Sequence, residues 1–408
     1  MPAARSGLAA PVVPAARRAA RRRRLLAWYD AARRDFPWRF PEGEADPYRV
    51  WISEAMLQQT QVARVIPFYR RFLEAFPTLA ALAGAGEEAV LAAWSGLGYY
   101  ARARALHRAA LEALARHGGL PASLQDLEAL PGFGPYTAGA VASIAFGIPA
   151  PAVDGNVARL LARLFAVDGP AESAATRRRL QALASALLGP DRPGDWTQAL
   201  IELGATRCVK PVPRCERCPV ASLCEARRTG REGELPPARR RPGRPRLRLE
   251  VGIVRHGGRL LLQRRPAEGL FGGLWGPPMI ELPDHSPGAA RRRKALVDGL
   301  SRGLGTPVRV GRELAATART LTHRELTLVA WEVTSRRRPE GSGLRWATPL
   351  EVEELGTASA IRALLAGLPP VRSRPKARKV RGGLGKRPGI KYIAPPVAPD
   401  SSDKGDAA

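Results

Sequence analysis

All four cysteines of the chain lie in one basic stretch, CVKPVPRCERCPVASLC, over residues 208–224. Their spacing, C-x6-C-x2-C-x5-C, is too dense for two unstrained disulfides and favours one four-thiolate site. Zinc and an iron-sulfur cluster are both open at this point. One isolated cysteine followed by a tight trio, with Pro219 directly after a ligand, favours the cluster. The candidate ligands are Cys208, Cys215, Cys218 and Cys224.

A glutamate stands inside an apolar helical stretch, PYRVWISEAMLQQTQVARV. Glu54 lies between Ile52 and Met56, and a carboxyl group in such surroundings is expected to have a raised pKa. A carboxyl with a raised pKa can donate a proton at neutral pH. Taken alone, the stretch is more typical of a glutamate at an exposed helix position.

The stretch LEALPGFGPYTAGAVASIAF predicts a tight turn between two helices. Gly132 and Gly134 would let backbone N–H groups approach an anion at the start of the second helix. A helix-hairpin-helix holds a DNA phosphate in this way. An ordinary turn is the alternative when this stretch is considered alone.

An aspartate precedes an amphipathic helix in VDGNVARLLARL. Asp154 has the ordinary role of a helix N-cap. Together with Glu54 it also completes the pair of carboxylates that cleavage of a glycosidic bond requires. One group protonates the leaving group, and the other stays anionic beside the oxocarbenium-like sugar.

Two folded domains are expected to position these groups. Apolar residues recur at three and four from Leu25 to Leu203, which predicts an all-α domain over residues 25–230 that includes the cysteine stretch. The Pro- and Arg-rich residues 231–248 are predicted to be a linker. Period-two patterns, with a hairpin at Gly257 and Gly258 and a helix near 291–304, predict an α+β domain over 249–370.

The two ends of the chain are basic and poor in acids. Residues 1–24 are expected to be a disordered arm, and residues 371–408 a disordered tail. The whole chain has 408 residues, a formal charge of +28 and a pI near 11.3, as expected of a polyanion binder or of an arginine-rich proteome. No apolar run reaches the length of a membrane span, and we expect a soluble protein of the cytoplasm, associated with the nucleoid.

The stretch from Trp38 to Cys224 resembles the catalytic domain of the helix-hairpin-helix DNA glycosylases, most specifically the MutY family of adenine DNA glycosylases. Six motifs occur in the family's order before the cysteines: PWR, WISEAMLQQTQV, GLGYYARAR, LPGFGPYTAGAVASIAF, VDGNVARLLARL and IELGATRC. The resemblance implies that the cysteines bind a structural 4Fe-4S cluster. The cluster would order a basic loop, including Arg207, Lys210 and Arg214, against DNA phosphates.

The resemblance also implies a role for each matching residue. Glu54 would protonate the adenine and later assist water, and Asp154 would stabilise or capture the sugar cation, with Asn156 and Tyr136 beside it. The positions that would line the pocket for the flipped adenine are Trp38, Arg39, Leu57 and Gln198. Gln59 and Tyr99 would enter the base stack beside the opposing base.

Endonuclease III is the nearest alternative, because it shares this fold and cluster. That enzyme carries a lysine nucleophile in the hairpin motif, where this chain has Tyr136. A phenol cannot form an imine, so we expect hydrolysis without strand cleavage.

The stretch GIVRHGGRLLLQRRPAEGLFGGLWGPPMIEL resembles the start of a Nudix-like domain. A working Nudix hydrolase holds magnesium with glutamates on the next helix, but here RRRKALVDGLSRGLG has only Asp298 as an acid. We therefore expect a reader domain and no pyrophosphatase. Thr322 and His323 in TLTHREL match the family's loop that inspects 8-oxoguanine, with Thr in place of the usual Ser.

The sequence thus predicts a monofunctional adenine DNA glycosylase of base excision repair, acting as a monomer. Its expected substrate is double-stranded DNA in which adenine is mispaired with 8-oxoguanine or guanine. A noncatalytic DNA-binding module is the alternative from another functional class. The presence of both Glu54 and Asp154 argues against it.

Overall fold

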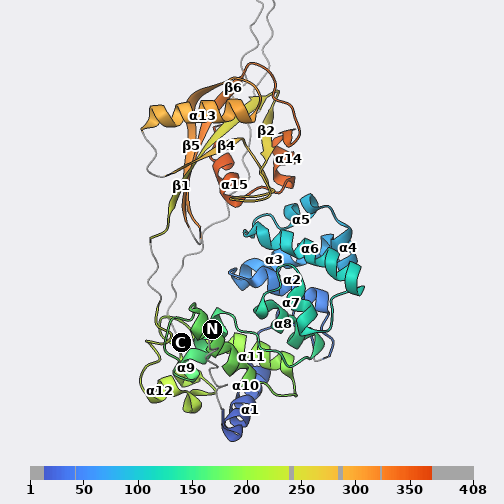
Figure 1. Ribbon diagram of the computed structural model, residues 1–408, viewed down its shortest axis with the longest axis vertical. Coiled ribbons are helices and arrows are strands. Elements are labelled where there is room, and N and C mark those ends of the chain that lie inside the picture. Colours follow the sequence, from blue (N-terminus) through green and yellow to red (C-terminus); the bar gives the residue numbers. More distant parts are fainter. Residues whose placement is uncertain (1–12, 42, 239–242, 284–287, 322–323, 370–408) are drawn as a thin grey trace, which may run out of the picture. The chain divides into compact units, whose positions relative to one another are not determined.

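Helices form the first part of the computed structural model, from Ala15 to Arg228 (Figure 1). The structure describes residues 13–41, 43–238, 243–283, 288–321 and 324–369. The helices are α1 (Ala15–Ala32), α2 (Pro47–Leu57), α3 (Val62–Ala75), α4 (Leu79–Gly84), α5 (Glu87–Ala93), α6 (Tyr100–His117), α7 (Leu124–Ala129), α8 (Pro135–Phe146), α9 (Gly155–Leu164), α10 (Ala174–Ala186), α11 (Pro193–Thr206), η1 (Cys215–Arg217), η2 (Ala221–Leu223) and α12 (Glu225–Arg228).

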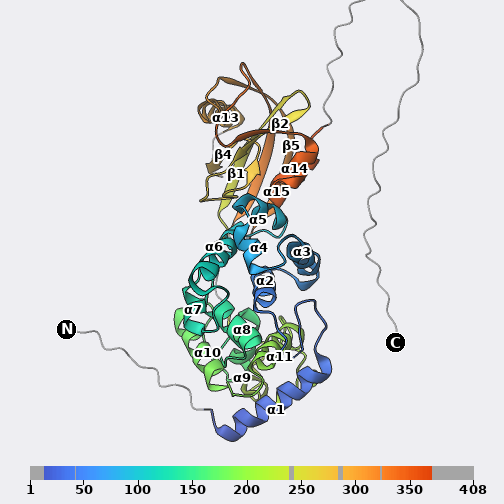
Figure 2. The ribbon, with the colours of Figure 1, turned by 90° about the vertical axis from the view of Figure 1, so that its right-hand side faces the viewer.

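These helices form two groups with separate apolar cores (Figure 2). The first group is contiguous in sequence, from α2 to α8, and buries large side chains such as Trp51, Phe72 and Trp94. The second group joins α1 to α9, α10 and α11, around Leu25, Tyr29 and other apolar residues. The groups meet where α8 packs against α11.

The structure corrects the expectation of a disordered arm over residues 1–24. Residues 15–24 belong to α1, and residues 1–12 lie outside the described part of the chain. Alanine and arginine are both strong helix formers, so this composition is compatible with a helix. The packing of Leu25 and Tyr29 in the second core holds α1 in place, and even Arg21 is only 4% exposed.

Three helices that will matter for chemistry have clear start signals. Asp46 accepts hydrogen bonds from the first turn of α2, and Asp154 does so for α9. Gly134 precedes α8, with Pro135 in the first helical position, where its missing N–H costs nothing.

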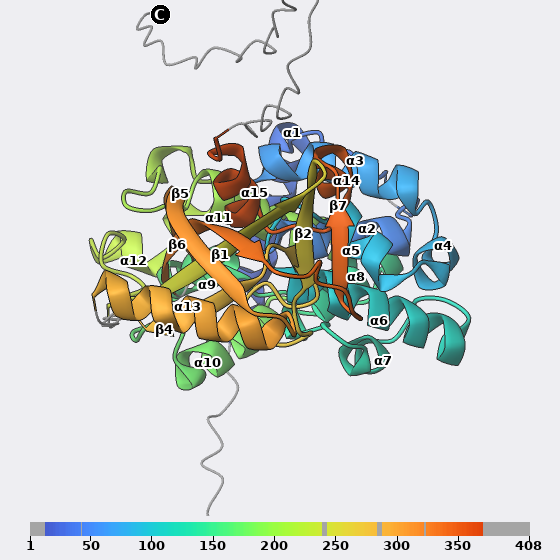
Figure 3. The same ribbon diagram turned by 90° about the horizontal axis from the view of Figure 1, so that it is seen from above.

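A seven-stranded mixed sheet forms the second domain (Figure 3). The strands are β1 (Arg246–His256), β2 (Arg259–Arg264), β3 (Trp275–Gly276), β4 (Met279–Pro283), β5 (Val308–Thr320), β6 (Glu325–Ser335) and β7 (Leu344–Ala347). The order is β3-β2-β1-β6-β5, with β4 paired to β1 and β7 to β2. The β1–β6 pair is parallel and the others are antiparallel, and β1 and β2 form the expected hairpin at Gly257 and Gly258.

Helices cover both faces of this sheet, as the alternation along β1 requires. Val251 and Ile253 point to the face that packs against α15 (Ser359–Ala366). Val254 points to the other face, against α13 (Ala289–Gly303). A short helix, α14 (Pro349–Glu354), packs beside β7. The helical domain followed by this mixed sheet confirms the predicted fold class.

The structure also shortens the predicted linker over residues 231–248, because residues near both of its ends are attached to folded parts of the protein. Leu235 is buried, and its carbonyl accepts a 2.8 Å hydrogen bond from Nε of Arg163 on α9. At the other end, β1 begins at Arg246, which pairs with Glu325 of β6. Sequence composition missed both attachments because they depend on partners far along the chain. None of the helices in the described residues has the length and apolar character needed to cross a membrane.

Candidate active site

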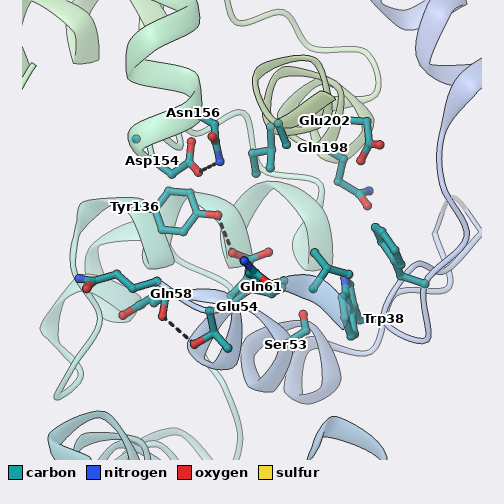
Figure 4. Close-up of a pocket in the computed structure, with 18 of the residues that line it drawn as sticks. Trp38, Ser53, Glu54, Gln58, Gln61, Tyr136, Asp154, Asn156, Gln198 and Glu202 are labelled. Carbon is teal, nitrogen blue, oxygen red and sulfur yellow. Dashed lines mark hydrogen bonds between the residues drawn. The ribbon is translucent and has the colours of Figure 1, made fainter. Parts of the chain in front are cut away.

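A cavity of about 780 Å³ is lined by residues of α2, α8, α9 and α11 (Figure 4). Because α2 and α8 belong to the first helical group and α9 and α11 to the second, neither group alone forms it. Ten residues singled out from the sequence line this cavity: Trp38, Arg39, Glu54, Leu57, Gln59, Tyr136, Asp154, Asn156, Gln198 and Lys210.

Glu54 is buried in the last part of α2. The hydroxyl of Tyr136, on α8, donates a 2.7 Å hydrogen bond to its Oε2. Burial raises the pKa of Glu54 to about 7; the Tyr136 hydrogen bond lowers it and the nearby charge of Asp154 raises it. At neutral pH a large fraction of Glu54 is therefore protonated, as a general acid must be.

Tyr136 lies in the first turn of α8, directly after the hairpin. Burial and the neighbouring carboxyls raise the pKa of its phenol well above the usual value, so it acts as a neutral donor. Further along α8, a Cβ on Gly139 would lie 2.2 Å from the carbonyl oxygen of Pro151. Only a glycine allows α8 to approach the segment leading to Asp154 this closely.

Asp154 is the N-cap of α9, so its ordinary role is present. Its Oδ1 accepts a 2.7 Å bond from the backbone N–H of Val157, and its Oδ2 accepts a 2.9 Å bond from the amide of Asn156. The pKa of Asp154 is raised overall, because the effect of burial exceeds that of these hydrogen bonds, which lower it. The positive end of α9 also favours the ionised carboxylate.

The cavity therefore brings together two carboxyl groups with different surroundings. Glu54 has a single neutral donor and Asp154 has several donors plus a helix N-terminus. Groups arranged in this way can protonate a leaving group on one side and stabilise a developing cation on the other. This is the chemistry of glycosidic bond cleavage.

Sequence reasoning missed Arg159, which continues the Asp154 network toward the cysteines. Its Nη2 donates to Oδ1 of Asn156 (2.9 Å) and to the carbonyl of Gly204 (2.6 Å), and its Nε donates to the carbonyl of Cys208 (2.7 Å). The sequence feature that could have indicated Arg159 is its position on the helix that Asp154 caps. Because the chain contains many arginines, this one was not singled out.

The wall formed by Trp38 and Arg39 is held by another residue that sequence reasoning missed. Glu202 on α11 is 2% exposed and accepts a 2.5 Å bond from Nη2 of Arg39 and bonds from Arg34. Trp38 stacks on Phe36 at 5.3 Å between ring centroids. Arg39 is thus fixed as part of the cavity wall.

The glycines of the hairpin between α7 and α8 are exposed, and the hairpin packs against α6 and α2. Gly132 has φ of 79°, and a Cβ there would lie 2.7 Å from the Cβ of Ala105. Phe133 stacks on Trp51 of α2 at 5.2 Å between centroids. Gly134 has open space around it at the start of α8, so a backbone phosphate can approach the turn.

Gln59 and Tyr99 are exposed and share an uncommon backbone conformation. Their φ angles are 57° and 51°, in the left-handed region that non-glycine residues rarely adopt. Tyr99 is 38% exposed, a large fraction for a tyrosine beside an apolar core. Of the two, Gln59 lines the cavity.

All four cysteines line a second, smaller cavity of about 20 Å³. None of them forms a disulfide. In the described residues, no three or more His, Cys, Asp or Glu side chains are close enough together to hold one metal ion. Four cysteine thiolates are the usual ligand set of a 4Fe-4S cluster, so the residues present fit that group.

A buried cation borders this cysteine cavity. Arg163 is 2% exposed, and its Nη1 lies 3.3 Å from Sγ of Cys208. Its other hydrogen bonds go to backbone carbonyls of Cys208, Val209 and Leu235, so it has no carboxylate partner among the described residues. A buried cation of this kind suits an anionic centre next to it.

The proposed lesion-reading residues Thr322 and His323 lie outside the described residues. The strands on both sides, β5 and β6, are described and form an antiparallel pair. Helix α13, where a Nudix hydrolase would carry its metal-binding glutamates, contains only Asp298 as an acid. Helix α13 therefore offers no glutamate for magnesium.

Comparison with known proteins gives the same two domains. Residues 52–185 match the HhH-GPD superfamily of base excision DNA repair proteins, and residues 250–367 match the NUDIX domain. Among solved structures, a thermostable thymine-DNA glycosylase resembles 52% of this chain over 98% of its own, with 28% identity and a TM-score of 0.47.

Relatives that carry the name adenine DNA glycosylase include a human and a bacterial protein. The human protein is 37% identical over 395 residues, covering 83% of this chain and 72% of its own length. The protein of Mycolicibacterium smegmatis is 45% identical over 208 residues, covering 50% of this chain and 69% of its own. The chain therefore belongs to the MutY family of adenine DNA glycosylases, and it is a DNA N-glycosylase of base excision repair.

Proposed function

We propose that this enzyme removes adenine mispaired with 8-oxoguanine or guanine, by hydrolysis and without cutting the strand. The observation that carries the chemistry is the pair of cavity carboxyls: Glu54, with its pKa raised to about 7, and the hydrogen-bonded Asp154. The choice of mispair is supported by family membership and by a Nudix-like domain whose α13 has no glutamate.

In the proposed reaction, Glu54 donates its proton to the departing adenine as the N-glycosidic bond breaks. Asp154 remains ionised and stabilises or captures the cation at the sugar C1′. Water then attacks that carbon, and the Glu54 carboxylate accepts its proton. Tyr136 keeps Glu54 oriented throughout through its 2.7 Å hydrogen bond, and Asn156 orients Asp154.

The remaining residues would recognise DNA. The flipped adenine would lie against Trp38, Arg39, Leu57 and Gln198, since the bond cannot be reached inside a duplex. Gln59 and Tyr99 would enter the vacated stack. Gly132 and Gly134 of the hairpin would hold a phosphate of the same strand.

We propose that Cys208, Cys215, Cys218 and Cys224 hold a 4Fe-4S cluster. When bound, it supplies structural order to the basic loop and takes no part in hydrolysis. The protein should be brown and contain about four irons per chain. Colourless protein with one zinc per chain would contradict this assignment.

We propose that Thr322 and His323 read the opposing base. Oxidation converts a guanine ring nitrogen from acceptor to donor and adds a carbonyl, which a hydroxyl and an imidazole can distinguish. The double variant Thr322→Ala, His323→Ala should lose its preference for A:8-oxoguanine over A:G while adenine release at saturation changes little. If this variant kept its full preference for A:8-oxoguanine, residues other than Thr322 and His323 would recognise the opposing base.

The deciding experiment measures single-turnover adenine release from duplexes with A:8-oxoguanine, A:G or A:T, followed by treatment with and without alkali. We expect fast release from the first duplex, slower release from the second, little from the third, and strand breaks only after alkali. Breaks without alkali, together with efficient borohydride trapping, would favour an endonuclease III-like lyase. We further propose that the enzyme acts as a monomer at the nucleoid, where its DNA partner is found.

A further inference from the structure

Arg102, in the first turn of α6, reaches back to the end of α2. Its Nη1 donates hydrogen bonds to the carbonyls of Ala55 (2.8 Å) and Gln58 (2.6 Å). These carbonyls belong to the C-terminal end of α2, where unpaired carbonyls and the helix dipole favour a cation. The residue that follows Gln58 is Gln59, one of the two exposed residues in the left-handed region.

The other side of the same guanidinium group meets the second exposed residue. The Cζ atom of Arg102 lies 4.7 Å from the centroid of the Tyr99 ring and 5.8 Å from that of Trp94. The backbone N–H of Arg102 also donates a 2.8 Å bond to the carbonyl of Tyr99. One side chain therefore contacts both segments that carry the left-handed residues.

The left-handed conformation needs such support. A non-glycine residue with φ near 50° is strained, and the strain persists only where the surroundings determine the conformation. At Gln59 the hydrogen-bonded carbonyl of Gln58 fixes the preceding peptide, and at Tyr99 the stacked guanidinium holds the ring. Both residues remain exposed while their backbones are fixed.

Arg102 does not have the contacts expected of a residue kept for stability. Its Nε and Nη2 are buried and have no hydrogen-bond partner among the described residues. Burial lowers its pKa to about 10, so it still carries its charge at neutral pH. Two unpaired donors on a partly buried cation are costly, and a shorter apolar side chain would avoid that cost.

We propose that Arg102 is a positioning residue that locks Gln59 and Tyr99 in their projecting conformations, so that both enter the DNA as one unit. This inference rests on the proposed function, in which these two residues occupy the stack beside the opposing base. Arg102 itself does not touch the reacting atoms. Its effect is confined to the opening of the base pair.

The test compares Arg102→Met with the matched control Arg108→Met, an exposed arginine on the same helix. Adenine release is measured on two duplexes, one with adenine opposite 8-oxoguanine and one with adenine opposite an abasic-site analogue, which offers no base to displace. A third duplex carries 2-aminopurine in place of adenine, and its fluorescence reports extrusion. Thermal unfolding of each variant shows whether it folds.

We expect Arg102→Met to slow extrusion and release on the paired duplex by about tenfold or more, because charge-assisted hydrogen bonds are lost. Adenine release from the duplex with the abasic-site analogue should change much less. Arg108→Met should match the wild type on both duplexes. Equal losses on both duplexes would overturn the proposal. If Arg102→Met does not fold, Arg102→Lys serves, because it keeps the charge but loses the stacked plane.

A double-mutant cycle with Tyr99→Ala separates positioning from general damage. If Arg102 acts through Tyr99, Arg102→Met should cost clearly less in the Tyr99→Ala background than in the wild type. Fully additive losses would refute the coupling. If the wild type releases no adenine from either duplex, the proposed function fails, whereas the 2-aminopurine signal still tests the role of Arg102.

Discussion

The two carboxyl groups of the cavity have different surroundings: apolar side chains around Glu54, and hydrogen-bond donors at a helix N-terminus around Asp154. Around Glu54 the last turns of α2 are buried in apolar packing, and one neutral hydroxyl reaches the carboxyl. Around Asp154 the chain offers a helix N-terminus, a backbone N–H and an amide. The comparison shows that burial raises the pKa of both carboxyls, whereas only Asp154 has several hydrogen-bond donors that act against this effect.

The strongest test of this contrast is Glu54→Gln. The amide keeps the size of the side chain but has no acidic proton, so adenine release should fall at least ~100-fold. Affinity for the mispaired duplex should stay within a few-fold of the wild type. Single-turnover release and equilibrium binding measure both, and near-normal release would remove Glu54 from the role of acid.

On the other side, Asp154→Asn should slow release by a similar or somewhat smaller factor, about 100-fold, since a neutral amide stabilises the sugar cation poorly. Asparagine is as good an N-cap as aspartate, so the melting temperature should hardly change. Asp154→Ala is the control for capping and should also lose about 1 kcal/mol of stability. A large drop in melting temperature for Asp154→Asn would show that its role is chiefly structural.

The raised pKa of Glu54 also predicts how stability depends on pH. Between about pH 4.5 and about 7 the folded protein retains a proton that the unfolded chain releases, so stability is full below this window and falls across it. The shift corresponds to a loss on the order of 3 kcal/mol. Glu54→Gln should therefore melt above the wild type at pH 8, with a smaller gap at pH 5. An equal gap at both values would contradict this explanation.

The smallest expected effect belongs to Tyr136→Phe. The Tyr136 hydrogen bond lowers the pKa of Glu54, so its loss should raise that pKa further. The wild-type rate should decline above about pH 7, and the decline of the variant should begin at higher pH, with only a modest loss at the optimum. A pH profile of single-turnover rates decides this, and a shift to lower pH would be the wrong sign.

Much of this site was predictable, because its members lie in local patterns. The apolar residues around Glu54, the turn before Tyr136 and the capping position of Asp154 are each visible within about ten residues. The cysteine spacing was similarly local. Each of these features can be recognised in a short stretch of sequence. The resemblance to a family then indicated that they belong to one site.

The contacts that join distant segments were not predictable. Arg159 and Glu202 became part of the site only when α9, α11 and the loop before α2 were placed together. Arg102 was not singled out, since the two carbonyls that accept its side-chain hydrogen bonds lie over forty residues away in the sequence. Residues 15–24 of α1 were predicted to be disordered because their composition is that of a basic tail, and only the packing of α1 against later helices reveals a structured element.

The packing of α1 against later helices constrains the order in which the helical domain folds. It packs with α9, α10 and α11, and Arg21 donates a 3.0 Å hydrogen bond to the carbonyl of Leu223, 202 residues later. At ~5–20 residues per second, roughly 10 to 40 s separate the synthesis of these two segments. The contiguous α2–α8 group can fold on the ribosome as it emerges, while α1 waits for its partners. The cavity between the groups can therefore be completed only after Lys210, the last residue that lines it, has been synthesised.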